Sequence, residues 1–302
     1  MFDLLPNQMH GFARSAGEAF HPNLWAEYLG GMTPCLGLAG RNVADVSPYR
    51  NDGALVGNAS LFSVTGSPIG PAVRFAGNVA IQWDGNATLG NKFKVGGNNQ
   101  PITLHAYFKY VAQPSSNYMA IFRSDSPTVG GLEYGYQLLV DAYDNKLIFQ
   151  THRGESIPPD TASPIYSSAA NSLTGGRWHN VAVTWYPLDA NDDSIGQFVV
   201  MNIDGQWIYP TFTGTERDIV HLASQHSRCG ASFNMTAVDM EVALVHVWKR
   251  RPAWREIDLL MVDPLAMFRR RVIGPIRPIV GSRIVSIGGA VSRRIGGIAV
   301  AG

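Results

Sequence analysis

The chain has 302 residues, of which 45% are hydrophobic and 16% are charged. This length allows one large β domain or two ordinary domains, and the hydrophobic content is sufficient for a sizeable core. The formal net charge of +1 argues against a nucleic-acid-binding protein. The first ten residues lack the basic and apolar regions of a signal peptide, and no uncharged apolar run approaches the ~18 residues of a membrane-spanning helix.

The first third of the chain predicts an irregular start followed by short strands. Residues 1–22 are expected to form an N-terminal arm, and short helices are predicted over 13–19 and 23–29. The stretch Gly30–Pro34 should end the second helix, because glycine and proline oppose its continuation. In the longest strand His105 falls on the polar face and is interpreted as a half-exposed residue without a metal or catalytic role. The strands are predicted over 54–56, 72–76, 79–83 and 101–111.

A hairpin gives the clearest local signal in the chain. Val181, Val183 and Trp185 alternate with more polar or smaller residues, which is the period of a strand. A second strand is predicted over 198–203, and it ends at Asp204–Gly205, a dipeptide that tolerates positive φ angles. Further strands are predicted over 118–123, 134–140, 146–151 and 206–209, and a long surface loop over 154–175.

The last part of the body is the most apolar. Residues 240–248 predict a central strand that is buried on both faces, and 252–261 predict a short helix. About twelve strands are expected, and no strand–helix unit repeats. The pattern predicts an all-β fold in which two antiparallel sheets form a sandwich.

Several segments together resemble the laminin-G-like, concanavalin A-like jelly-roll family, in particular single-domain versions from bacteriophages and environmental bacteria. The likeness covers about residues 23–270. Its most recognisable part is the hairpin formed by 176–185 and 202–205. The other segments that carry it are 23–37, 43–55, 72–77 and 241–268.

The resemblance implies an all-β, antiparallel two-sheet jelly-roll sandwich with extended N- and C-terminal arms. The expected domains are an N-terminal arm over 1–22, a jelly roll over 23–268 and a basic, β-prone C-terminal arm over 269–302. Such domains bind glycans, proteins or calcium, or serve as structural decorations, and the fold alone does not decide among these roles.

Two kinds of residue offer glycan chemistry. Exposed aromatic rings stack on sugars, and the candidates are Tyr134, Tyr136, Trp207 and Tyr209; the alternative is that most of them fill the core. Hydrolysis would require paired carboxylates, for which Asp239 and Glu241 are the nearest match. Because no third acid follows them, an enzyme is not expected.

Calcium is the only ion or cofactor for which the sequence offers a candidate site. Asp189, Asn191 and Asp193 place oxygen ligands at alternating positions, although a solvated hairpin tip explains the same pattern. The two cysteines, Cys35 and Cys229, are interpreted as free or buried thiols rather than a disulfide.

The C-terminal arm differs from the body in charge. It has no acidic residue, and without its arginines 17 basic side chains stand against 23 acidic ones, a net charge of −6 for the rest of the chain. Isoleucine and valine alternate with glycine, serine and arginine, which is typical of a strand that pairs with another chain. The seven arginines are Arg269, Arg270, Arg271, Arg277, Arg283, Arg293 and Arg294.

The sequence is therefore interpreted first as a virion structural or surface protein, such as a capsid decoration, cement or fibre component anchored by its arms. Its partners would be further copies of itself, for example in a trimer, and a capsid or other virion protein. The alternatives are a glycan-binding adhesin or receptor-binding module, located on the virion surface or outside the cell, and a glycan hydrolase or lyase. A host-surface glycan is a further expected partner, whereas a membrane and nucleic acid are not.

Overall fold

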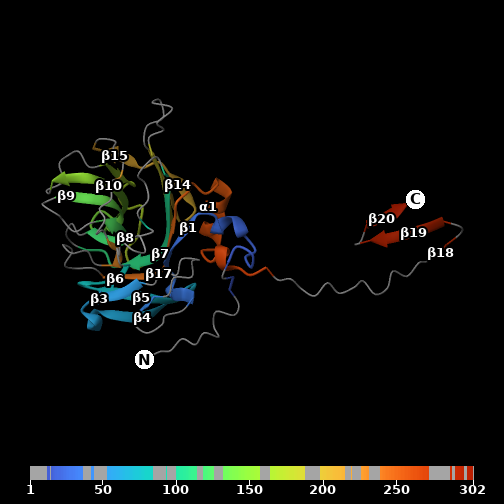
Figure 1. The fold of residues 1–302 in the computed structure, drawn as a ribbon, viewed down its shortest axis with the longest axis horizontal. Coiled ribbons are helices and arrows are strands. Elements are labelled where there is room, and N and C mark those ends of the chain that lie inside the picture. The colour runs from blue at the N-terminus through green and yellow to red at the C-terminus, as the bar shows by residue number, and fades with distance from the viewer. Residues whose placement is uncertain are drawn as a thin grey trace, which may run out of the picture. The chain divides into compact units, whose positions relative to one another are not determined.

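Two antiparallel sheets form the body of the protein in the computed structural model (Figure 1). The chain divides into two units, Met1–Arg270 and Arg271–Gly302. The structure describes residues 12–13, 15–36, 42–43, 53–83, 93, 100–113, 118–125, 132–156, 164–187, 198–214, 219, 226–230, 239–271, 286–287, 290–295 and 298–301.

The first sheet, called sheet A, has eight strands among the described residues. Seven of them follow the order β14 (Gln206–Ile208), β13 (Phe198–Ile203), β12 (Trp178–Tyr186), β7 (Ile102–Tyr110), β17 (Asp239–Trp248), β5 (Gly70–Ala76) and β4 (Phe62–Ser67). The eighth, β1 (Tyr28–Met32), also pairs with β17. The strand predicted over 240–248 is thus central.

The predicted hairpin is confirmed in sheet A. Strands β12 and β13 pair antiparallel, with Val181 opposite Ile203. The turn into β14 contains Asp204 and Gly205, whose φ angles are +51° and +87°. A tight two-residue turn needs positive φ at both central positions, and the Asp-Gly dipeptide supplies it.

The second sheet, sheet B, faces sheet A across the main core. Its described strands follow the order β15 (Thr211–Thr213), β11 (Ile165–Ser167), β10 (Lys146–Ser156), β9 (Leu132–Asp141), β8 (Tyr118–Asp125), β16 (His226–Gly230), β6 (Val79–Trp83), β3 (Gly53–Gly57) and β2 (Asn42–Val43). The all-β, two-sheet sandwich is confirmed. Large buried side chains between the sheets include Trp83, Phe108, Phe122, Phe149 and Trp185.

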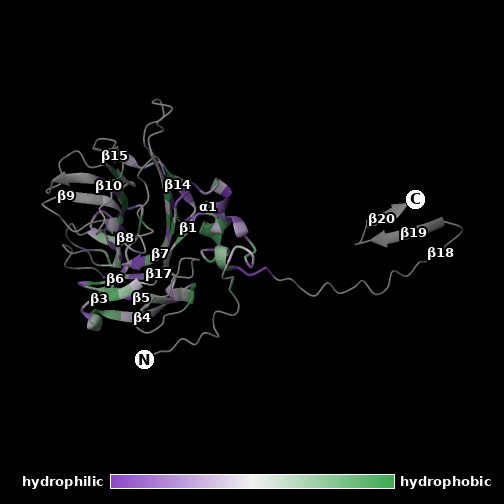
Figure 2. Cartoon of the chain, viewed as in Figure 1, coloured by the Kyte–Doolittle hydropathy of each residue, from purple (hydrophilic) through white to green (hydrophobic). Residues whose placement is uncertain are grey.

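A second apolar cluster covers the outer face of sheet A. It contains Trp25, Trp248, Leu260 and Phe268, so it joins the start of the unit Met1–Arg270 to its end. The elements that supply it are α1 (Trp254–Val262) and the 3₁₀ helices η2 (Pro22–Trp25) and η5 (Ala266–Phe268). The remaining short helices are η3 (Pro34–Leu36) and η4 (Ala59–Leu61). Figure 2 shows hydrophobic stretches in strands such as β3 and hydrophilic stretches in α1.

Hydrogen bonds hold the two ends of this layer together. The Trp25 Nε1–H donates to the Met267 carbonyl at 2.7 Å, and the Trp248 Nε1–H donates to the Leu24 carbonyl at 2.7 Å. The Phe20 N–H donates to the Arg269 carbonyl at 2.7 Å. The outer layer is therefore closed by chain segments that lie more than 200 residues apart in sequence.

Three local predictions were wrong. The helix predicted over 23–29 is a single 3₁₀ turn followed by strand β1, because residues 28–32 pair with β17. Residues 15–19 form turns and a bridge to Arg270 rather than a helix. The predicted loop over 154–175 contains the end of β10 and strand β11.

The prediction that His105 is a half-exposed residue of β7 was wrong. The predicted division into two faces holds, since Leu104, Ala106 and Phe108 lie in the main core. However, Thr103 and His105 are fully buried as well. Their face is covered by the outer apolar layer, so an alternating pattern did not indicate exposure to solvent.

The unit Arg271–Gly302 contains a three-stranded antiparallel sheet of its own. Its strands are β18 (Ser286–Ile287), β19 (Ala290–Ile295) and β20 (Ile298–Ala301). The β-prone character predicted for the arm is thus present in its backbone. In the described part of the chain no helix is both long and apolar enough to cross a bilayer.

Candidate functional site

An aromatic stack lies where β12 ends and β13 begins. Tyr186 and Phe198 are paired across the two strands, and their rings stack with centroids 4.0 Å apart at 11°. The Arg251 guanidinium lies 4.9 Å from the centroid of the Tyr186 ring. Because Phe198 already occupies one face of this ring, Arg251 must lie on the other. The order is therefore Arg251, Tyr186, Phe198.

The stack holds the Tyr186 ring in place, whereas Phe198 and Tyr209 are exposed to solvent. Tyr186 is enclosed on both faces, and burial raises its pKa above the usual value although Arg251 opposes this. Phe198 is 36% exposed, and nearby Tyr209 is 77% exposed. Phe198 lies on the outer face of sheet A, and Tyr209 follows the end of β14 at the same edge of the sheet. We call Arg251, Tyr186, Phe198 and Tyr209 the aromatic surface.

Trp207 connects this edge of sheet A to α1. Its Nε1–H donates to the Asp258 carboxylate at 3.0 Å, and its ring meets Trp254 edge-to-face with centroids 4.2 Å apart. Trp207 is partly buried, and its polar group already has a partner. These two contacts hold β14, and Tyr209 after it, against the helix.

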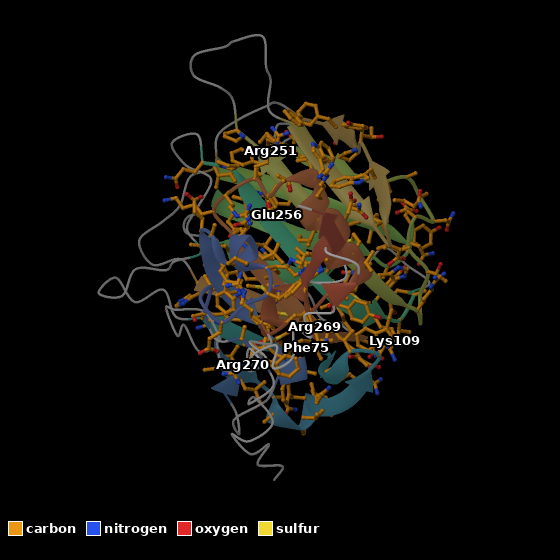
Figure 3. All side chains as sticks on the ribbon, turned by 90° about the vertical axis from the view of Figure 1, so that its right-hand side faces the viewer. Phe75, Lys109, Arg251, Glu256, Arg269 and Arg270 are labelled. Carbon is orange, nitrogen blue, oxygen red and sulfur yellow. The ribbon has the colours of Figure 1, made fainter. Side chains whose placement is uncertain are left out.

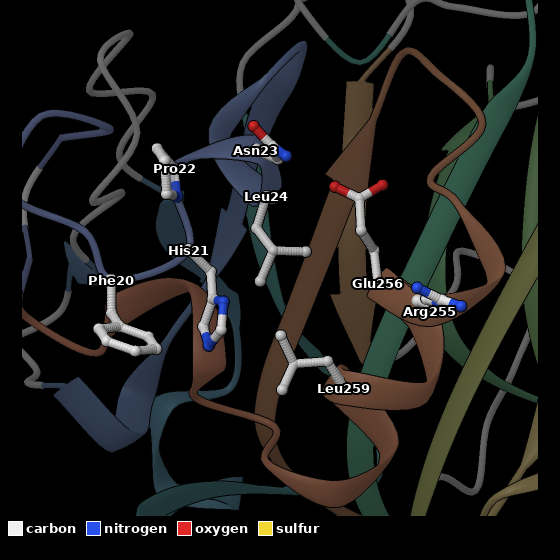
Figure 4. A pocket seen from close by; sticks show the side chains of 8 residues that line it. All are labelled: Phe20, His21, Pro22, Asn23, Leu24, Arg255, Glu256 and Leu259. Atoms are coloured by element: carbon white, nitrogen blue, oxygen red, sulfur yellow. The ribbon is translucent and has the colours of Figure 1, made fainter. Parts of the chain in front are cut away.

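On the other side of the α1 N-terminus lies a groove of about 340 Å³ (Figure 4). One wall is the segment before β1, and the other is the first two turns of α1. Phe20 is 60% exposed and meets His21 edge-to-face with centroids 4.7 Å apart. The lining residues are Phe20, His21, Pro22, Asn23, Leu24, Arg255, Glu256 and Leu259.

Arg250 holds the two walls of the groove together. Its guanidinium donates to both oxygens of Glu256, at 2.8 and 3.0 Å, and to the Asn23 and Ala26 carbonyls at 2.8 and 2.7 Å. The planar fork of an arginine suits several such acceptors at once. The Ala253 N–H also donates to Glu256, at 2.6 Å. Burial alone would raise the pKa of Glu256, but these hydrogen bonds hold it below the usual value.

The acidic pair considered for hydrolysis lies at the opposite end of the outer face, where Lys109 is labelled in Figure 3. Both oxygens of Asp239 accept hydrogen bonds from Arg74 at 2.9 Å. Glu241 accepts one from Thr65 at 3.0 Å and pairs with Lys109 at 2.8 Å. Each carboxylate is thus paired with a cation.

Comparisons with known proteins show the fold. No protein-family model matches the chain, and no curated protein sequence matches it. One similar solved structure is the binding domain of botulinum neurotoxin DC in complex with rat synaptotagmin II, with TM-score 0.54 and 11% identity over 80% of this chain and 52% of that one.

Two further structures are similar to a comparable degree. One is of botulinum neurotoxin type C, a toxin described as interacting with two ganglioside molecules, with TM-score 0.52, 11% identity, and coverage of 80% of this chain and 52% of that one. The other is a mutant of Trypanosoma rangeli sialidase with trans-sialidase activity, with TM-score 0.50, 17% identity, and coverage of 80% and 34%. The chain thus spans about half and about a third of these proteins.

Such low identities establish the sandwich and nothing finer. The similarity agrees with a jelly-roll, lectin-like architecture. The narrower resemblance to laminin-G-like domains of bacteriophages stays a prediction, as do the proposed domain boundaries.

The predicted glycan-stacking residues have different surroundings. The prediction that Tyr136 is an exposed stacking residue was wrong. Tyr136 is fully buried, and its hydroxyl donates to the Phe93 carbonyl at 2.8 Å. The side chain of Tyr134 lies outside the described residues. Trp207 is hydrogen-bonded to α1, and among the three candidates with described side chains only Tyr209 has an exposed ring. Sequence reasoning missed Tyr186, Phe198 and Arg251; the aromatic residue at each end of the predicted hairpin loop was a usable signal.

The remaining candidate residues are only partly covered by the structure. The calcium candidates Asp189, Asn191 and Asp193 fall in the β12–β13 connection, outside the described residues. Within the described ranges, no three His, Cys, Asp or Glu side chains come together as a metal-binding group. Cys229 is a buried free thiol, as interpreted, and burial raises its pKa. Of the arm arginines, Arg269 pairs with Asp263 at 2.7 Å; Arg277, Arg283, Arg293 and Arg294 have no described side chains.

Proposed function

We propose that this protein is a glycan-binding module, and that the aromatic surface is where a sugar ring binds. The observation that carries the proposal is the exposure of two rings, Phe198 and Tyr209, near the β14 edge of sheet A. Exposed aromatic rings that gather on one part of an ordered surface favour a binding role, whereas a single exposed ring is common.

The stack gives this surface the properties that a sugar requires. A pyranose has an apolar face of C–H groups and a rim of hydroxyls, so it pairs with a flat ring beside polar groups. Phe198 has one face covered by Tyr186, so the ring is held in place before a ligand arrives. Arg251 and the Tyr209 hydroxyl offer hydrogen-bond donors nearby. Little entropy is then lost on binding.

The comparisons support the same class of ligand. One similar structure is that of a neurotoxin described as interacting with two ganglioside molecules, which carry sugar headgroups. Another belongs to a sialidase. A binding function needs no proton donor, and the pairing of Asp239 and Glu241 with cations also favours binding over hydrolysis.

The proposal is tested by glycan binding to the full chain and to two variants, Phe198→Ala and Tyr209→Ala. Each ring offers roughly 60 Å² of contact, worth about 1.5 kcal/mol at ~25 cal/mol per Å², so each variant should bind about tenfold more weakly. Tyr143→Ala is the matched control, because Tyr143 is 56% exposed in the β9–β10 turn of the other sheet. A glycan array without a bound glycan, or equal losses in the control, would contradict the proposal.

Display on a virion is the setting that we propose for this module. The basic C-terminal arm and its small sheet support it, because a body with a net charge of −6 attracts such an arm in a neighbouring copy. Co-sedimentation of the full chain with capsids, lost on deletion of residues 271–302, is the expected result. Retention of the truncated chain on capsids would contradict the role of the arm.

A further inference from the structure

The groove beside α1 contains a cation without a partner. Among the described residues, Arg255 has no ion pair and no hydrogen bond, although it lines one wall. Its neighbour Glu256 does not neutralise it, since both oxygens of that carboxylate are taken by Arg250 and one also by the Ala253 N–H. The groove therefore carries an uncompensated positive charge at its helical wall.

The opposite wall is aromatic and largely open. Phe20 is 60% exposed, and its ring meets His21 edge-to-face on this side of the groove. Leu24 and Leu259 contribute apolar surface between the walls. The volume of about 340 Å³ is in the range of small-ligand sites. The lining thus combines a flat ring, apolar contact area and a charged donor with a fork geometry.

The walls are also held at a fixed separation. Arg250 bonds the Asn23 and Ala26 carbonyls on one side and Glu256 on the other. Neither wall depends on a ligand for its position, so the groove is formed in advance. Arg250 is thus engaged by Glu256 and the two carbonyls, whereas the adjacent Arg255 is left free.

We propose that this groove is a second subsite that takes a carboxylate-bearing sugar unit, such as a uronic or sialic acid, with Arg255 paired to the carboxylate and Phe20 against the ring. The inference rests on the proposed glycan-binding function. An arginine binds a carboxylate through two parallel hydrogen bonds, which a neutral hydroxyl cannot reproduce. The subsite would therefore give the module a preference for acidic over neutral glycans.

The experiment compares acidic oligosaccharides with the same compounds after reduction of the carboxyl group to an alcohol. Titration calorimetry on the full chain should give at least tenfold tighter binding of the acidic form, the effect of one charge-assisted pair. In Arg255→Gln this preference should disappear, because glutamine cannot form the charged pair with the carboxylate. Arg177→Gln, which changes an exposed arginine at the other end of β12, is the control and should keep the preference.

The outcomes separate the subsite from the function. Equal binding of both forms, still weakened by Tyr209→Ala, overturns the acidic subsite and leaves glycan binding intact. A preference that survives Arg255→Gln but is lost in Arg251→Gln also overturns it, because the carboxylate would then be read at the aromatic surface. Failure of every glycan to bind overturns the proposed function and the subsite with it.

Discussion

His105 should make the protein lose stability in mild acid. It is fully buried in β7, and its Nε2 lies 2.8 Å from the Asn180 Oδ1. The Asn180 Nδ2 donates to the Leu260 and Met261 carbonyls, at 2.8 and 3.1 Å, so the amide oxygen faces His105. Nε2 must therefore carry the proton, and Nδ1 is left with a lone pair.

Protonation of His105 would be costly for this reason. The added N–H on Nδ1 would have no acceptor, since Nδ1 lacks a hydrogen-bond partner among the described residues. The adjacent ring of His246, with its centroid 5.7 Å away, is also buried. Burial lowers the pKa of His105 from 6.5 to about 4, against the smaller raising effect of the Asn180 hydrogen bond.

The sign and size of the effect follow from proton linkage. Between pH 6.5 and pH 4 the unfolded chain binds a proton at this position and the folded protein does not. The free energy of unfolding therefore decreases as the pH falls through this range. At pH 5 the loss is about 2 kcal/mol, from 1.5 pH units at 1.36 kcal/mol each. That is a substantial part of a typical domain stability of ~5–15 kcal/mol.

The variant His105→Gln isolates this contribution. Glutamine cannot take up the proton, and its amide N–H is able to donate to Asn180. Urea denaturation at pH 7 and pH 5, followed by tryptophan fluorescence, should show a pH-dependent loss about 2 kcal/mol smaller than in the wild type. His152→Gln in sheet B should give a separate reduction, because burial and Arg123 lower the pKa of His152 to about 3. Equal losses in wild type and His105→Gln would refute the reasoning.

Three further predictions concern the closure of the fold. Asn180→Asp should cost about 3 kcal/mol or more in urea denaturation, because a carboxylate cannot donate to the two carbonyls at the end of α1. Gly31→Ala should lower the melting temperature by the equivalent of roughly 2 kcal/mol or more, since its Cβ would lie 1.9 Å from the Val245 carbonyl oxygen and push β1 off β17. Deletion of residues 271–302 should leave the circular dichroism and thermal unfolding of the body unchanged, because the rest of the chain forms a unit of its own.

The sandwich was predictable because its strands obey local rules. Alternation identified β12, the Asp204–Gly205 dipeptide marked the end of β13 and its turn into β14, and the apolar run at 240–248 identified the central strand. The outer layer was not predictable in this way. Trp25 and Met267 are joined by a hydrogen bond across 242 positions of sequence, and no local pattern contains that information.

The same limit applies to the site. Tyr136, Leu138 and Val140 alternate along one strand and all lie in the main core. The position of Tyr136 two residues before Leu138 was therefore a usable sign of burial. Tyr209 follows the last residue of a short edge strand and is open. The groove was beyond sequence reasoning, because Phe20 and Arg255 come from opposite ends of the chain and meet only when the outer layer closes.

Two consecutive arginines, Arg250 and Arg251, connect the closure of the outer layer to the two proposed binding surfaces. Arg250 turns toward the segment before β1 and locks it to α1, whereas Arg251 turns to the edge of sheet A and covers Tyr186. The connection from β17 to α1 thus separates the groove from the aromatic surface and supplies a cation to each side. Since Arg250 makes four hydrogen bonds that close the outer layer, both proposed binding surfaces depend on the same closure that stabilises the fold. Binding and stability should therefore be coupled at Arg250 and separable at Arg251 and Arg255.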